Sequence, residues 1–187
     1  MGSQYNKVLQ TACWLWITLG AVLAADKDHR QADAHEHGHG VVNIAIEGDR
    51  LSIELTAPGA DIVGFEHVAR SDQQKAIVTA AKHLLSQPLK VVGLPRMARC
   101  SAIAKDIEFH TAANRDAKTE ASPEHSEFRA TYQFLCKSVA KLTHIEFHYF
   151  KLFTNTQELD VTVLSDKGQK KFEVTPKSAV IVLTGVI

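Results

Sequence analysis

The sequence predicts an α+β protein, a mainly antiparallel β-sheet of about seven strands with one main amphipathic helix. Three observations support this fold class. Several segments alternate apolar and polar residues, short turn sequences join neighbouring segments of this kind, and one segment carries a clear apolar stripe at helical spacing. Strands that follow one another through hairpin turns argue against a parallel, doubly wound sheet, because parallel neighbours need long crossover connections.

The first two strands are predicted to form a hairpin. Apolar side chains alternate along residues 41–47 and again along residues 51–55. Gly48-Asp49 between them is a turn sequence, and Pro58-Gly59 ends the second strand. The first strand is therefore expected to begin directly after His39.

The one convincing helix follows the first hairpin. Ser71 is its predicted N-cap, with Gln74 at capping-box spacing, and Pro88 ends it. The residues at helical spacing that form its apolar stripe are Ile77, Val78, Ala81, Leu84 and Leu85. The preceding residues 60–67 are too short and interrupted for a long helix, and they predict a helical turn or an ordered loop.

Later strands are indicated by alternation or by β-branched and aromatic content. The segments concerned are residues 98–109, 128–136, 143–153, 159–174 (a second hairpin) and 179–183. Alternation is clearest in residues 128–136, where it places Cys136 on the core side. Residues 110–125 are polar and predict a surface loop.

The chain is expected to be exported. Residues 1–24 contain Lys7 and an apolar run that ends in Ala21-Val22-Leu23-Ala24, a pattern typical of a cleavable signal peptide. An uncleaved amino-terminal anchor is the alternative. A polar, His-rich segment over residues 25–40 and a single α+β domain over residues 41–187 would then make up the mature protein.

Export affects how the two cysteines of the mature protein are interpreted. Cys100 and Cys136 are an even number in an oxidising compartment, which predicts a disulfide bond worth about 4 kcal/mol. A Cys/His zinc site is the alternative. It is disfavoured because neither cysteine belongs to a close pair.

The composition points to metal handling. The chain has ten histidines but only three tyrosines and two tryptophans, whereas 21 basic and 21 acidic residues leave no positive excess to attract nucleic acid. Three of the histidines, His35, His37 and His39, alternate with Glu36 and Gly38 ahead of the first strand. Alternate side chains of an extended segment project to one side, and neutral imidazole is a common Zn²⁺ ligand. We therefore expect a metal site here that at least two of the three histidines contact, and to which the strand-anchored His37 and His39 contribute more affinity than His35. A polar, solvated segment is the alternative.

Two further clusters could complete the ligand set. Glu66-His67 lies in the predicted loop, with hydrogen bonding to backbone as the alternative role. His144 and His148 lie on either side of Glu146, and the alternative there is the solvent face of a strand. In a strand these two histidines lie about 13 Å apart, too far to share one ion directly, so that they could serve separate or shared sites. If residues 143–153 were helical instead, the two histidines would be neighbours at spacing four.

Sequence signatures of catalysis are missing. There is no nucleophile elbow, no glycine-rich phosphate loop and no cysteine placed for nucleophilic work, so we expect a binding protein rather than an enzyme. The other hypotheses are a secreted structural or interaction module with incidental histidines, and a zinc hydrolase in which Glu66 or Glu146 is the general base.

The chain resembles the ZrgA-like proteins. The residues that carry the resemblance are His37-Gly38-His39-Gly40, Pro58-Gly59-Ala60, Gly64-Phe65-Glu66-His67, Ala98-Arg99-Cys100 and Tyr132-Gln133-Phe134-Leu135-Cys136. The resemblance implies a periplasmic zinc-binding protein of a Gram-negative bacterium that assists zinc uptake, by capturing the ion or handing it to an ABC-type importer. Many such proteins carry a long His/Asp/Glu-rich insertion between the two cysteine strands, whereas residues 110–125 contain only His110 and His125.

Overall fold

The computed structural model describes residues 37–111 and 125–187, which all belong to one compact unit that spans residues 31–187. The predicted signal peptide and His35 lie outside the described residues. The proposed division of the chain at residues 24 and 40 stays a prediction. No helix of the described part of the chain is long and apolar enough to cross a membrane.

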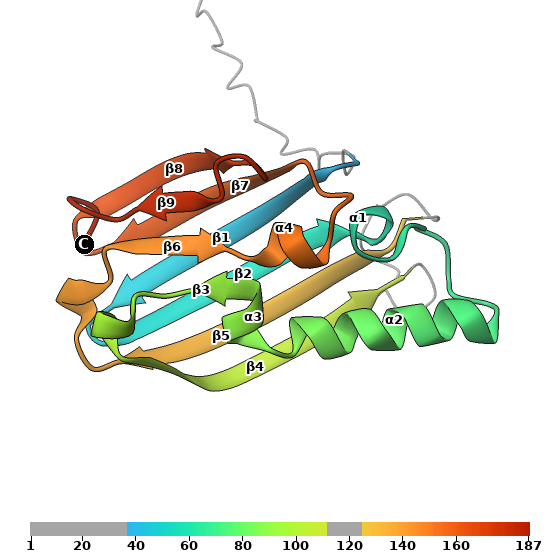
Figure 1. The fold of residues 1–187 in the computed structure, drawn as a ribbon, viewed down its shortest axis with the longest axis horizontal. Coiled ribbons are helices and arrows are strands. Elements are labelled where there is room, and N and C mark those ends of the chain that lie inside the picture. The colour runs from blue at the N-terminus through green and yellow to red at the C-terminus, as the bar shows by residue number, and fades with distance from the viewer. Residues whose placement is uncertain (1–36, 112–124) are drawn as a thin grey trace, which may run out of the picture. The chain divides into compact units, whose positions relative to one another are not determined.

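A six-stranded sheet forms the main layer (Figure 1). The strands lie in the order β4-β5-β2-β1-β7-β8, and every neighbouring pair is antiparallel except β1 and β7. Their bounds are β1 His39–Glu47, β2 Arg50–Pro58, β4 Cys100–His110, β5 Glu127–Cys136, β7 Glu158–Ser165 and β8 Gly168–Val174.

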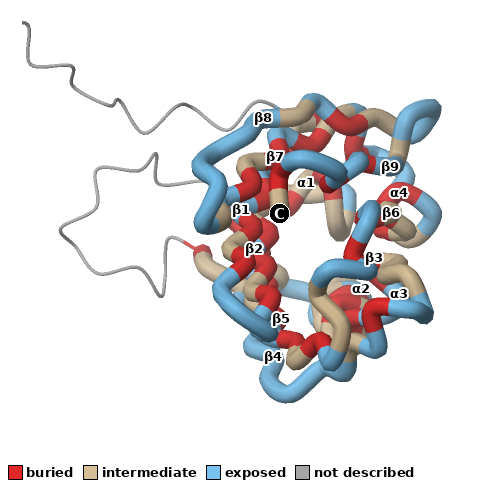
Figure 2. Tube along the Cα trace, turned by 90° about the vertical axis from the view of Figure 1, so that its left-hand side faces the viewer, coloured by how far each residue is buried: buried red, intermediate tan, exposed pale blue. Residues whose placement is uncertain are grey.

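A second layer covers one face of this sheet. It contains a three-stranded sheet in the order β3-β6-β9 and most of the helices (Figures 1 and 2). The bounds of these strands are β3 Val92–Gly93, β6 His144–Phe147 and β9 Val180–Val182. The helices are α1 Gly59–Val63, α2 Asp72–Leu85, α3 Pro88–Val91 and α4 Tyr149–Leu152, with 3₁₀ turns η1 Arg96–Ala98 and η2 Val139–Lys141.

The hydrophobic core lies between the two layers. Burial alternates along β1, β2, β5 and β7, and the buried set includes Ile44, Ile53, Phe134 and Val163. The opposite face of the large sheet carries polar residues that are exposed on these same strands. The predicted alternation and both predicted hairpins are therefore confirmed.

The numbers of elements differ from the prediction. The described residues form nine strands rather than about seven, and three short α-helices accompany the main helix α2. The additional elements have two to five residues, too few to show a period in the sequence. The strand expected over residues 143–153 ends at Phe147, and α4 follows because a helical turn buries both Tyr149 and Phe150.

The long helix α2 begins as predicted. The Ser71 side chain accepts a hydrogen bond from the amide of Gln74, and the Gln74 side chain accepts one from the amide of Ser71. Replacing Ser71 with alanine should lower the free energy of unfolding by about 1 kcal/mol, because an orphan amide at the helix start loses its acceptor. Urea denaturation measures this; an unchanged midpoint would show that the cap does not stabilise the fold.

A disulfide bond joins the two neighbouring strands β4 and β5. Cys100 and Cys136 lie opposite each other in the strand register, and the bond confirms the predicted pairing. It anchors an edge strand to the rest of the sheet.

Candidate metal centre

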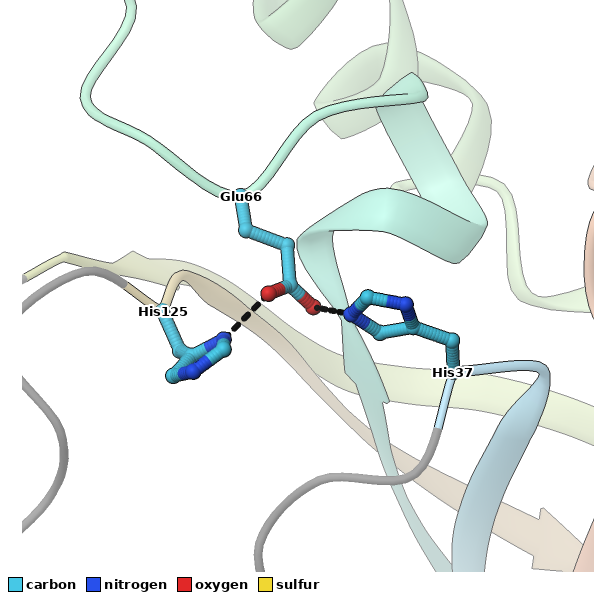
Figure 3. Close-up of side chains that lie close together, drawn as sticks. All are labelled: His37, Glu66 and His125. Carbon is cyan, nitrogen blue, oxygen red and sulfur yellow. Dashed lines mark hydrogen bonds and ion pairs between the residues drawn. The ribbon is translucent and has the colours of Figure 1, made fainter.

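Three side chains from distant parts of the sequence converge at one end of the large sheet (Figure 3). Nε2 of His37 lies 3.0 Å from Oε1 of Glu66, and Nδ1 of His125 contacts Oε2 of the same carboxylate. One ligand atom of each residue lies within 4.8 Å of the other two. We call this cluster the Glu66 site.

Strand pairing explains why these residues meet. His37 precedes the first residue of β1 by two positions, and β2 runs antiparallel to β1. The end of β2 therefore returns to the start of β1, and the chain continues through α1 to Glu66. On the other side of β2, Pro58 pairs with Glu127 near the start of β5, which brings His125 to the same end of the sheet.

Two glycines fix the backbone around the site. Gly38 has φ +88°, its amide donates to Oδ1 of Asp61 at 2.8 Å, and its carbonyl accepts from the amides of Gln157 and Glu158. Gly59 donates to the carbonyl of Ser126 at 2.7 Å, and a Cβ at Gly59 would lie 2.0 Å from Oγ of Ser126. These close contacts fix the backbone beside His37 and beside His125, next to α1.

The carboxylate of Glu66 lies half-buried between two more exposed rings. The side chain of Glu66 is 13% exposed, against 64% for His37 and 38% for His125. Asp61 lies nearby and is buried. Burial raises the pKa of Asp61 above its ordinary value, whereas the hydrogen bond from Gly38 and the charge of His37 act in the opposite direction.

Buried polar atoms that lack a regular hydrogen bond mark the same region. Among the described residues they are Oε1 of Glu66, which nevertheless lies 3.0 Å from Nε2 of His37, Oδ2 of Asp61 and Oγ of Ser126. Glu66 is in the cluster, and Ser126 directly follows His125. Unsatisfied polar atoms are costly and rare in native proteins. Their concentration here fits a site that gains a partner when it binds a cation.

The donor set suits zinc. Two imidazole nitrogens and one carboxylate oxygen are ligands that Zn²⁺ accepts, and a site with three protein ligands leaves a fourth position for water or another donor.

Of the predicted ligands, the structure brings together His37 and Glu66. His39 is the first residue of β1 and lies outside the cluster. The ring of His67 stacks on Phe65, and its Nδ1 contacts the carbonyl of Val68 at 3.0 Å. Neither His39 nor His67 belongs to a group of three potential ligands among the described residues.

The predicted ligands of the later segment lie on the second layer. Oε2 of Glu146 is 3.2 Å from Nε2 of His148, and Oε1 is 3.3 Å from Nζ of Lys151. The hydrogen bond with His148, followed by that with Lys151, lowers the pKa of Glu146. His144 is exposed beside Thr143. These residues are likewise outside any group of three ligands that the described residues form.

Sequence reasoning missed His125 and Asp61. His125 falls at the end of a segment predicted as a surface loop, and Asp61 is one acidic residue among many. The available signal was that residues 51–58 and 127–136 both alternate. Had they been paired as antiparallel neighbours, His125 would have been placed beside α1.

The fold and the site define an α+β protein with a candidate metal centre of two histidines and one glutamate at the end of its main sheet. The model of a family described as ZrgA family zinc uptake protein matches residues 34–183, and the chain belongs to this family. The resemblance noted from the sequence motifs is thereby confirmed. No curated protein matches the chain.

Proposed function

We propose that this is a periplasmic zinc-binding protein that assists zinc acquisition by capturing Zn²⁺ at the Glu66 site and handing it to an importer. The observation that carries the proposal is the half-buried carboxylate of Glu66, whose two oxygens contact the imidazoles of His37 and His125. Membership of a zinc uptake family supports zinc as the ion.

The site combines a fixed and an accessible part, which suits capture and release. Glu66 is held within the protein, whereas the ring of His37 is 64% exposed at the surface. A Zn²⁺ ion bound by His37, Glu66 and His125 would keep one coordination position open. A ligand from a receiving protein could coordinate the ion at this open position before the exposed His37 dissociates from it.

In this proposal zinc is cargo, and the protein is not an enzyme. A hydrolase with this centre needs a free general base beside the metal. Glu66, one of the two glutamates considered for that role, contacts both histidines and acts here as a ligand. Glu146 pairs with His148 and Lys151 instead.

Export to the periplasm is supported by two features. The disulfide bond between Cys100 and Cys136 suits an oxidising compartment, and residues 1–24 have the pattern of a signal peptide. An ABC-type zinc importer is the partner that we propose. The alternative, a secreted structural module with incidental histidines, predicts that loss of the Glu66 site changes nothing.

Calorimetric titration of chelator-stripped residues 25–187 with Zn²⁺ at neutral pH tests the proposal. We expect a dissociation constant below about 10 μM, corresponding to more than about 7 kcal/mol of binding free energy. The variant with alanine at positions 37, 66 and 125 should lose this binding event. A weaker wild-type constant, or unchanged binding by the triple variant, would contradict zinc capture at this site.

A further inference from the structure

The proposed zinc site has a second buried carboxylate beside it. Asp61 is 3% exposed and lies on α1, the short helix between the end of β2 and Glu66. It is not one of the three clustered ligands. Asp61 is nevertheless linked to the cluster, because its carboxylate accepts a hydrogen bond from Gly38, the residue that follows His37.

Asp61 holds the backbone of His37 in place. Oδ1 of Asp61 accepts the amide of Gly38 at 2.8 Å in a buried hydrogen bond, and the carbonyl of Gly38 is fixed from the other side by the amides of Gln157 and Glu158. His37 is therefore attached to a peptide with a defined orientation, although its ring is exposed. A ligand fixed in advance loses less conformational entropy when it binds.

The other oxygen of this carboxylate, Oδ2, is buried without a regular hydrogen bond to any described residue. The side chain of Thr156 interacts with the carboxyl and acts to lower its pKa, but its hydroxyl is hydrogen-bonded to that of Tyr149. Burying a charge without compensation is costly. The charges of His37 and Glu66 both act on Asp61, so a cation bound between these two residues would stabilise the buried carboxylate as well.

We propose that Asp61 is a positioning and charge-balancing residue of the metal site, which fixes His37 through the Gly38 amide and matches the site to a divalent cation. The inference rests on the proposed function. Asp61 and Glu66 together supply two negative charges. A bound Zn²⁺ ion neutralises both of them, whereas a monovalent ion such as Ag⁺ leaves one negative charge. Asp61 thus selects for ion charge without contacting the ion.

Asp61→Asn tests the charge separately from the hydrogen bond, because the amide oxygen of asparagine can still accept from Gly38. We expect a zinc affinity about tenfold lower, at the lower end of the effect of losing an outer-shell partner. The loss of Ag⁺ affinity should be smaller, since the electrostatic energy scales with the charge of the ion. Asp61→Ala, which also removes the acceptor, should lose more zinc affinity than Asp61→Asn.

Tyr132→Phe is the matched control for stability. It removes a buried hydrogen bond, from the Tyr132 hydroxyl to the carbonyl of Leu85, away from the site. It should lower the melting temperature without changing zinc affinity. If Asp61→Ala does not fold, Asp61→Asn still decides the question.

Two results would overturn the role of Asp61: wild-type zinc affinity in Asp61→Asn, or equal losses for Zn²⁺ and Ag⁺, as a purely structural role predicts. Either result leaves the proposed function standing as long as the wild type binds zinc. If the wild type does not bind zinc, the proposed function itself has failed.

Discussion

Replacing Glu66 with glutamine should weaken zinc binding by about 100-fold, or about 2.7 kcal/mol. Glutamine has nearly the same shape but no charge, so the two imidazoles lose the anion between them and the ion loses its only carboxylate ligand within the cluster. Because Glu66 is 13% exposed, solvent screens its charge less than that of a surface residue. Competition with a chromophoric chelator measures the change.

The neighbouring residue gives a matched control. His67→Ala removes an imidazole next to Glu66, but that ring stacks on Phe65 and contacts the carbonyl of Val68. We expect His67→Ala to retain wild-type zinc affinity. A loss of zinc affinity as large as that of Glu66→Gln would show that His67 of the 64–67 loop is a ligand, and that the Glu66 site does not account for binding.

The histidines can be compared in the same assay. His37→Ala and His125→Ala should each lower zinc affinity, whereas His39→Ala should have little effect because His39 lies outside the cluster. The opposite order, in which His39→Ala lowers zinc affinity and His125→Ala does not, would favour the strand-anchored histidine motif predicted from the sequence over the Glu66 site.

Local sequence patterns correctly predicted the parts of the fold that depend on residues close together in the chain. The capping box at Ser71 and Gln74 and the turn at Gly48-Asp49 each lie within a few positions of the chain, and the structure contains both. Alternation likewise marked the strands, because their side chains face either the core or solvent.

His39 lies outside the cluster for a local reason. An extended segment would put His37 and His39 on one side, but Gly38 adopts φ +88° and breaks the extended geometry between them. His37 therefore turns toward α1 while His39 enters β1. The sequence shows that a glycine is present, but the sign of its φ angle is set by the hydrogen bond that its amide donates to Asp61 and by those that its carbonyl accepts from Gln157 and Glu158, which are distant in the chain.

The presence of His125 in the cluster has a non-local cause. His125 joins the site because β5 pairs with β2, and 59 positions separate His125 from Glu66. Alternation identifies a strand but not its neighbour. His148 falls outside the strand predicted for it for another reason, since β6 ends one residue before it and α4 is only four residues long.

Removing the disulfide bond should have the largest effect on stability, about 4 kcal/mol for the loop that it closes. Cys100 and Cys136 are separated by 36 positions, and the bond restricts the unfolded chain over that distance. Cys100→Ala with Cys136→Ala tests this, because alanine avoids placing a hydroxyl at the buried position of Cys136. Guanidinium denaturation of residues 25–187 measures the loss; a change below about 1 kcal/mol would contradict it.

The position of β4 indicates where the loss should appear first. β4 is an edge strand that pairs only with β5, and most of its residues are exposed, including Ile103. With few buried contacts, it depends on the β5 ladder and on the disulfide bond at its first residue. In hydrogen exchange, amides of residues 101–109 should therefore lose protection in the double variant before those of β1 and β2. Equal loss of protection in all strands would show that the bond stabilises the whole domain rather than this edge. Thiol labelling of unfolded, non-reduced residues 25–187, which contain only Cys100 and Cys136, should give no adduct, since both sulfurs are in the bond. Labelling at either cysteine would contradict the pairing.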